Sequence, residues 1–439
     1  MKNGIWLALA LLSALAYTYL GYGIERANFA EVLVCFAVPF SAYFLLLIWR
    51  KKRPSFQYLI YTAIGFRLIF LFALPSLSDD YFRFLWDGQL FANGLNPFDF
   101  KPEEVENLIP QKQALLEGMN SPQYYSIYPP IAQYIYAFAA WLFPHSLLGG
   151  VVVMRLFILA AEIGTLYLLP KVLQQFFMNR EKTLIYALNP LVIIELSGNL
   201  HFEAIVIFFL LLAIRFLQKD DTVFGGLSWA LAAATKLIPL IFLPVFLRTW
   251  KWPKPFWFYA FGGFAFLLLW FPFQSFGFWE HFRSSVDLYF STFEFNAGLY
   301  YLIREVWQSA VGYNPIQTLG PMLSKVSLVG VLVILWRRKW PNLKAIFTPI
   351  LMALLLYYSL ALIVHPWYIC TLVFLSLFTK YTFPVLWSVL VVLSYATYQT
   401  EAYQENHYLV AVEYLLLFGW IGVELLRHYQ RRLPWLRLY

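Results

Sequence analysis

Charged residues are scarce in this 439-residue chain, and their scarcity excludes most classes of soluble protein. Only 13% of the residues are Asp, Glu, Lys or Arg and 61% are hydrophobic, whereas a soluble domain carries about 25% charged residues. No stretch is both long enough and polar enough to form a separate soluble domain. We therefore expect an all-α, polytopic transmembrane bundle with its function built into the helices and loops.

Cysteine is also scarce. The two cysteines, Cys35 and Cys370, lie in apolar segments far apart in the sequence, so no disulfide framework is implied. The net charge of +8 would suit a nucleic-acid partner, but the basic residues cluster in short loops, as they do where positive charge sets membrane topology. We expect the lipid bilayer as a partner and no nucleic acid.

Hydrophobic runs, in contrast, fill most of the chain. A span needs roughly 20 apolar residues, and fewer where it is buried in protein. The first run follows Met1 without a small-residue cleavage pattern, so we expect a retained first helix. The runs predict about 14 spans, near residues 5–22, 31–49, 57–75, 151–169, 183–198, 200–217, 222–235, 237–248, 256–274, 318–336, 345–363, 366–379, 383–398 and 408–426.

Basic clusters alternate with these runs. If the clusters face the cytoplasm, both termini lie there too. This holds only if the apolar segment 127–144 does not cross; it begins Tyr128-Pro129-Pro130, and proline suits the first turn of a helix. We expect an embedded helix here, within one long outer loop at 76–150. The clusters begin at Arg50, Lys171, Arg215, Arg248, Arg337 and Arg427.

Two adjacent acids, Asp79 and Asp80, open the polar part of that loop. Ser78 is a good helix N-cap and Asn93-Gly94 a good stop, which predicts an amphipathic interfacial helix between them. Asp80, Arg83 and Asp87 share one face of this helix by their spacing. Paired acids at a membrane surface favour a functional role, although they could merely complement the helix dipole. Asp87 could equally be a salt-bridge or turn residue.

Three more polar residues interrupt apolar sequence on the same expected side. His201 and Glu203 follow a polar turn; a histidine there could be structural, or the pair could join the two aspartates around a divalent cation. Their spacing is not specific for a metal. Lys236 lies between two half-length apolar stretches, where it could bind an anion or extend to the interface.

Two further residues are candidate substrate contacts. His365 precedes Trp367 and Tyr368, which are typical of an interfacial aromatic belt. Arg304 neighbours Glu305, so a mutual ion pair or a lipid-headgroup contact would explain it as well as substrate binding would.

The sequence resembles the GT-C superfamily of glycosyltransferases, and within it the bacterial polyprenyl-phosphate-mannose-dependent mannosyltransferases. The similar segments cover about residues 57–370. They are SDDYFRFLWDG from Ser78, NGLNPF from Asn93, YPP from Tyr128, LNPL from Leu188 with Glu195, TKLIP from Thr235 and HPWY from His365.

The resemblance implies transfer of a sugar, expected to be mannose, from a polyprenyl phosphate to a hydroxyl of a glycan, lipid or protein. If the transfer is a single displacement, it inverts the anomeric carbon. It implies an outer-loop acid, Asp80 or Asp79, as catalytic base. Substrate contacts are then expected from Arg83, Asp87, Tyr128, His201, Glu203, Lys236, Arg304 and His365. No cofactor is expected. A divalent metal is not favoured, because the second acidic motif of the oligosaccharide-transferring branch is represented only by His201-Phe202-Glu203.

The same resemblance divides the chain into three parts. Residues 1–56 form two additional N-terminal helices, 57–274 a catalytic transmembrane module, and 275–439 an outer re-entrant segment followed by C-terminal helices. The expected location is a bacterial inner membrane with the active site facing outward. Two alternatives stay open, namely a flippase or transporter of lipid-linked glycans and a glycan polymerase or ligase.

Overall fold

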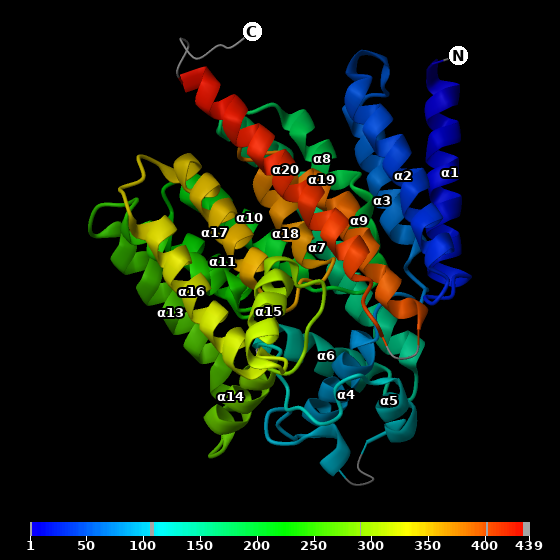
Figure 1. Ribbon diagram of the computed structural model, residues 1–439, viewed down its shortest axis with the longest axis vertical. Helices are drawn as coiled ribbons and strands as arrows, with labels where there is room; N and C mark the ends of the chain where they lie inside the picture. Colours follow the sequence, from blue (N-terminus) through cyan, green and yellow to red (C-terminus); the bar gives the residue numbers. More distant parts are fainter. Residues whose placement is uncertain (1, 106–108, 290, 401–402, 433–439) are drawn as a thin grey trace.

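The computed structural model describes residues 2–105, 109–289, 291–400 and 403–432, and these residues are almost entirely helical (Figure 1). An isolated parallel bridge between Phe295 and Ile363 is the strand-like pairing found within them. The α-helices are α1 Lys2–Tyr22, α2 Phe29–Ile48, α3 Phe56–Ile69, α4 Asp80–Ala92, α5 Lys112–Gly118, α6 Pro130–Leu142, α7 Leu147–Gln175, α8 Thr183–Ala187, α9 Pro190–Val192, α10 Glu203–Gln218, α11 Thr222–Ala233, α12 Pro244–Leu247, α13 Lys254–Trp270, α14 Phe278–Tyr289, α15 Gly298–Val311, α16 Ile316–Trp336, α17 Phe347–Leu360, α18 Tyr368–Ser376, α19 Phe383–Leu390 and α20 His407–Arg432.

Seven helices of the described chain are long and apolar enough to cross a bilayer, and an eighth candidate is a pair bent by 111°. The bent pair joins Pro190–Gly198 to Glu203–Gln218. All 14 predicted runs are helical, but several are short; α11, with 12 residues, reaches only about 18 Å at roughly 1.5 Å per residue. The protein is a polytopic helical membrane protein. The seven helices are Gly4–Tyr22, Phe29–Ile48, Leu147–Gln175, Lys254–Phe273, Ile316–Trp336, Leu343–Leu360 and His407–His428.

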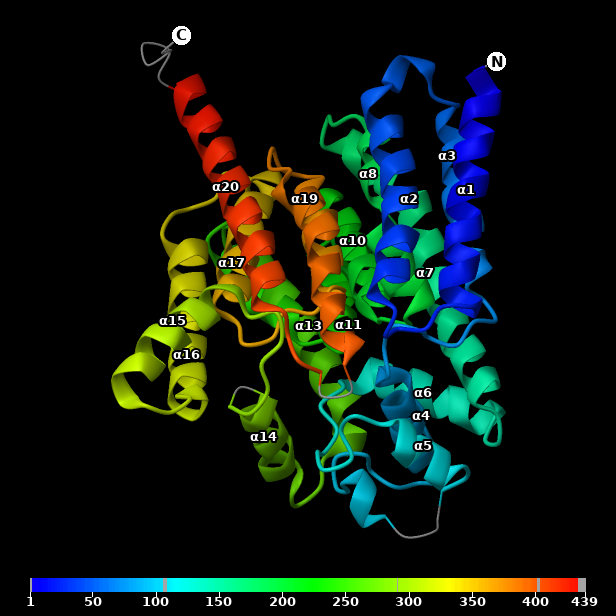
Figure 2. The ribbon, with the colours of Figure 1, turned by 45° about the vertical axis from the view of Figure 1, so that its right-hand side comes forward.

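Basic turns gather at one end of the bundle, which is also the end where α1 begins and α20 ends (Figures 1 and 2). Arg53 pairs with Glu181, and the Lys182 ammonium donates to the carbonyls of Leu377 and Thr379. Turns that are far apart in the sequence therefore meet there. This arrangement agrees with the predicted alternation of basic and polar loops.

The opposite end holds α4, α5, α6 and α14 (Figures 1 and 2). Helix α4 forms as predicted, with Asn93 as its C-cap before a left-handed Gly94, but its N-cap is Asp79 rather than Ser78. Its apolar side packs on protein rather than on lipid, since Leu85, Trp86 and Leu90 are buried. The predicted embedded helix is α6, whose 13 residues reach about 20 Å at roughly 1.5 Å per residue, too short for a hydrocarbon core of about 30 Å.

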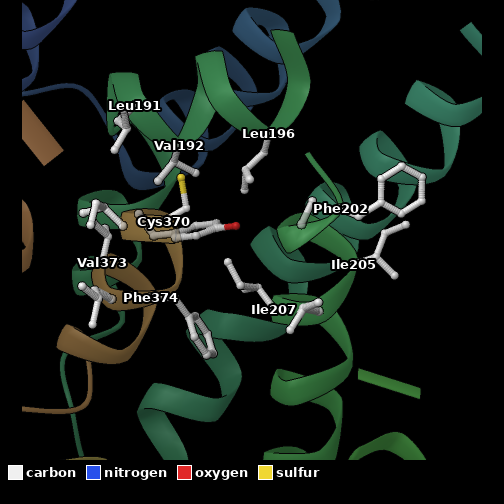
Figure 3. Close-up of a cluster of buried hydrophobic side chains, with 14 of the residues drawn as sticks. Leu191, Val192, Leu196, Phe202, Ile205, Ile207, Cys370, Val373 and Phe374 are labelled. Carbon is white, nitrogen blue, oxygen red and sulfur yellow. The ribbon is translucent and has the colours of Figure 1, made fainter. Parts of the chain in front are cut away.

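A tightly packed core anchors the break in the bent pair. Leu196 from the segment before the break and Ile207 from α10 lie against Cys370 and Phe374 of α18 (Figure 3). These side chains are fully buried, so they hold the ends of α10 and α18 in fixed relation. The polar residues at those ends, around His201 and Trp367, are thereby positioned next to each other.

Candidate functional site

Three interruptions in the helical bundle meet near the N-terminus of α4. The break before α10 presents His201 and Glu203, and the residues after α11 present Lys236. The turn before α18 presents His365. Lys236 interacts electrostatically with Asp80 and with both histidines, and Glu203 interacts with Asp80. The structure thus brings together five residues that the sequence singled out separately.

Asp80 is the first residue of α4 and is partly buried. The pKa of Asp80 is raised to about 6, mainly by burial and in part by the negative charges of Asp79 and Glu203, whereas Lys236 and a hydrogen bond from Asn120 oppose the rise. A carboxylate with a pKa near neutrality is well matched to accept a proton at physiological pH.

Asp79 has a different environment although it is adjacent in sequence. Its carboxylate forms an ion pair with Arg26, with a distance of 2.7 Å between Oδ2 and Nη1. Arg26 comes from the turn between α1 and α2 and lies over the ring of Tyr398, 4.5 Å from the ring centre. One acid of the pair is therefore directly neutralised, and the other faces Lys236 and Glu203.

Lys236 and Glu203 form the second ion pair of the site, with 2.5 Å between Nζ and Oε1. Glu203 is almost fully buried, and its Oε2 finds no hydrogen-bond partner in the described chain. The Lys236 side chain is 21% exposed. An ammonium group has three donors, so Lys236 can pair with Glu203 and still bind an anion.

Three stacked rings border this ion pair. Trp367 lies between two histidines, with ring centres 3.7 Å from His201 and 4.2 Å from His365. Burial and the nearby Lys236 lower the pKa of His365 to about 3, so its imidazole is neutral. Within the described residues His201 Nε2 and His365 Nδ1 lack hydrogen-bond partners. Neutral rings with free nitrogens can bind hydroxyl groups.

Arg83 and Asp87 lie behind Asp80 on α4 and bind each other. The Nε atom of Arg83 donates to Asp87 Oδ1 at 2.8 Å, and Nη1 donates to the carbonyls of Ser121 and Tyr124. Asp87 also accepts a hydrogen bond of 2.5 Å from Ser126. Both side chains are buried, so they fasten the loop that follows α5. Their contacts match the salt-bridge alternative that the sequence left open.

The remaining two predicted contacts have aromatic or acidic neighbours. Tyr128 packs edge-on against Phe84 of α4, 5.1 Å between ring centres. Arg304 lies on α15 and pairs with Glu294 and Glu305. The expected mutual pair of Arg304 and Glu305 is therefore present, together with a second, more buried acid.

Two residues that stabilise the site were not predicted to do so. Arg155 of α7 donates to the carbonyls of Ser197 and Gly198, at 2.7 and 2.9 Å, and to those of Leu71 and Ala73. It thereby ties the break before α10 to the segment that leads into Asp79. A charged residue in the middle of an apolar helix is a sequence signal for such a role, but it does not identify the partners.

Glu195 is the other such residue and lies in a π-helical turn, Ile193–Gly198. Such turns often occur at functional sites. Its carboxylate accepts hydrogen bonds from Tyr395 and from Asn199, the latter at 3.1 Å, and lies 3.5 Å from His201 Nε2. No group of three or more His, Cys, Asp or Glu side chains in the described part of the chain is arranged to hold a metal ion.

Comparison with known proteins adds a family to this geometry. A curated relative, alpha-(1->6)-mannopyranosyltransferase A of Mycobacterium tuberculosis, is 23% identical over 181 residues, which are 41% of this chain and 34% of the relative. The chain thus matches about a third of that relative's length. No solved structure matches. The family model for the alpha-(1->6)-mannopyranosyltransferase N-terminal domain matches residues 7–252, including α1 and α2. Because this match spans more than half of the sequence, the chain belongs to the alpha-(1->6)-mannopyranosyltransferase family.

Proposed function

We propose that this protein is a membrane mannosyltransferase. It transfers mannose from a polyprenyl-phosphate donor to an acceptor hydroxyl on the extracytoplasmic side, with inversion at the anomeric carbon. The observation that supports this most strongly is the placement of Asp80, a carboxylate with a pKa raised to about 6, beside the Lys236–Glu203 ion pair. The family match supports mannose as the sugar.

The chemistry needs a base and a cation. A phosphate leaves without a strong general acid, but the attacking hydroxyl has to lose its proton, which Asp80 accepts. Negative charge develops on the departing phosphate, and the Lys236 ammonium stabilises it. The sugar carbon acquires oxocarbenium character, which the nearby Glu203 carboxylate stabilises. His365 Nδ1, which has no hydrogen-bond partner within the described residues, and His201 Nε2, which lies 3.5 Å from the Glu195 carboxylate, bind sugar hydroxyls.

The donor and acceptor follow from the position of the site and from the family. The site lies at the end of the apolar bundle that is opposite the basic turns, so a lipid-anchored phosphate reaches it from the bilayer. The name of the family describes an alpha-(1->6)-mannopyranosyl transfer. We therefore propose the 6-hydroxyl of a mannoside as the acceptor, with the outer segment 275–317 contributing to its binding.

The test measures transfer from radiolabelled polyprenyl-phosphate mannose to an alkyl α-mannoside by the purified protein. Asp80→Asn should lower turnover by about 10²- to 10⁴-fold, the usual contribution of a general base. Asp220→Asn, at the exposed Lys254 pair on the basic end, is the matched control and should leave turnover unchanged. Normal turnover in Asp80→Asn, or retained anomeric configuration in the product, would contradict the proposal.

The broken helices at residues 199–202 and 234–237 also suit a transporter of lipid-linked glycans, because transporters bind substrates at such breaks. The transporter and the mannosyltransferase differ in whether polyprenyl phosphate is released. A transporter moves the labelled donor across the membrane of a proteoliposome and leaves the sugar–phosphate bond intact, whereas the mannosyltransferase releases polyprenyl phosphate. Translocation without bond cleavage would favour the transporter.

A further inference from the structure

Arg26 links the first two helices to the acidic pair. It lies in the turn between α1 and α2, and its guanidinium binds Asp79 at 2.7 Å. Tyr398 supports the guanidinium from below at 4.5 Å, and Tyr403 lies at 5.9 Å. The Arg26 side chain is 20% exposed and that of Asp79 is 30% exposed. This is a partly desolvated ion pair with an aromatic platform, which is stronger than an exposed one.

The pairing separates two acids that would otherwise be electrostatically alike. Asp79 and Asp80 are adjacent, and like charges at such short range disfavour ionisation of one of them. The cation bound to Asp79 opposes this repulsion, although the charge of Asp79 still raises the pKa of Asp80. Asp80 has no such direct cation, since the ion pairs within 4.0 Å in the described chain do not include it.

We propose that Arg26 is a positioning residue for the transfer reaction. By binding Asp79 from the α1–α2 turn, it leaves Asp80 as the carboxylate that takes the proton of the acceptor. This inference rests on the proposed function. It gives the first two helices a role in the chemistry, in addition to their role in the bundle.

The charged and titratable groups that face Asp80 come from five directions. Lys236, which follows α11, lowers the pKa of Asp80 by its positive charge. Glu203, the first residue of α10, and Asp79 raise that pKa by their negative charges. Tyr398, from the segment after α19, also faces these groups: the charges of Asp80 and Asp79 raise its pKa and that of Arg26 lowers it. The charge of Asp80 contributes to raising the pKa of Tyr136 of α6. None of these groups other than Arg26 is an ion-pair partner of Asp79 in the described residues.

The test is the pH dependence of mannosyl transfer from labelled polyprenyl-phosphate mannose. In the wild type, activity should fall as the pH drops through about 6, because a protonated Asp80 cannot act as a base. This fall is the acid limb of the pH–activity profile. In Arg26→Gln the unpaired charge of Asp79 should move the acid limb to higher pH, by about 0.5 to 1 pH unit. Activity should recover at alkaline pH. Arg26→Lys should restore the limb.

The double variant Arg26→Gln with Asp79→Asn is decisive. Removing the unpaired carboxylate should return the acid limb to the wild-type position or below it. If Arg26 instead bound the donor phosphate, Arg26→Gln would raise the donor KM at every pH, and Asp79→Asn would not correct it. That result, or an unshifted acid limb in Arg26→Gln, overturns the proposal.

A merely structural role of the turn is tested by a neutral control. Ser76 Oγ donates to the carbonyl of Leu20 at 2.8 Å, so Ser76→Ala loosens the same junction without changing charge and should leave the limb in place. If Arg26→Gln cannot be recovered as folded protein, Asp79→Asn is measured alone. The acid limb of Asp79→Asn should lie at lower pH than that of the wild type, and a shift to higher pH contradicts the proposal. Wild-type transfer itself reports on the proposed function separately.

Discussion

At the scale of single residues, the acid–base behaviour of the site depends on which charged side chains have a direct ion-pair partner. Asp79 binds Arg26 and Glu203 binds Lys236, and Asp80, whose pKa is raised, interacts electrostatically with members of both pairs. A general base works best when it is ionised yet not strongly stabilised as an anion. The two ion pairs therefore set the electrostatic environment of Asp80, in which its carboxylate can accept and release a proton.

Lys236 should contribute mainly to binding of the donor phosphate. We expect Lys236→Ala to raise the donor KM by about tenfold or more, the usual loss for a hydrogen bond to a charged group. The acceptor KM should change little, because the ammonium group faces the phosphate rather than the hydroxyl. Steady-state kinetics with each substrate varied in turn measures both values. Equal effects on the two would argue against a phosphate role.

The sequence predicted the members of this site better than their pairings. Asp80, Glu203, Lys236 and the two histidines were recognisable because polar residues interrupt apolar runs. Arg26 was not, because its partner is 53 positions away and an arginine in a short turn between spans has no distinguishing pattern. The face shared by Arg83 and Asp87 was predicted, but the loop carbonyls that bind Arg83 leave no sequence signal.

At the scale of helices, the position of Asp80 depends on how closely α4 packs against α6. Gly88 allows this approach, since a Cβ atom added there would overlap the backbone carbonyl of Tyr136. Ile131 of α6 in turn donates its amide to the carbonyl of Ala234 at 2.9 Å. Helix α6 therefore connects the helix that carries the base with the segment that carries Lys236.

Gly88→Ala should destabilise this contact, because overpacking of a close helix pair costs roughly 1–3 kcal/mol. We expect a lower melting temperature in detergent and reduced transfer activity. Gly65→Ala on α3 is the matched control, since a Cβ there meets nothing within 4 Å and alanine favours helix. Thermal unfolding monitored by size-exclusion chromatography compares the two. Equal stability of both variants would show that α4 and α6 do not need the close contact.

Helix positions were largely predictable, and the number of full spans was not. Apolar runs and the Tyr128-Pro129-Pro130 start predicted α6 and the helices of the bundle. The number of crossings depends on where helices break, as between Gly198 and Glu203, where Arg155 binds the buried carbonyls of Ser197 and Gly198. Such tertiary capping lets half-length helices exist inside a membrane protein, and hydropathy does not distinguish them from full spans.

At the scale of the whole molecule, charge is divided between two ends. Basic turns lie together at the end where α1 begins and α20 ends, as the Arg53–Glu181 pair and the contacts of Lys182 show. The acidic site lies at the other end with α4 and α6. Positively charged loops usually remain in the cytoplasm, so this division predicts that Asp80 faces outward, where a lipid-linked donor is used.

Cysteine labelling tests this orientation directly. Both native cysteines are buried, so single cysteines can be added at exposed positions on each end. A membrane-impermeant maleimide should label Glu117→Cys, next to the site on α5, in intact spheroplasts. It should label Arg338→Cys, in the basic turn after α16, only once the membrane is permeabilised. The opposite pattern would place Asp80 in the cytoplasm, and a base on that side could not serve a donor and acceptor held on the outer surface.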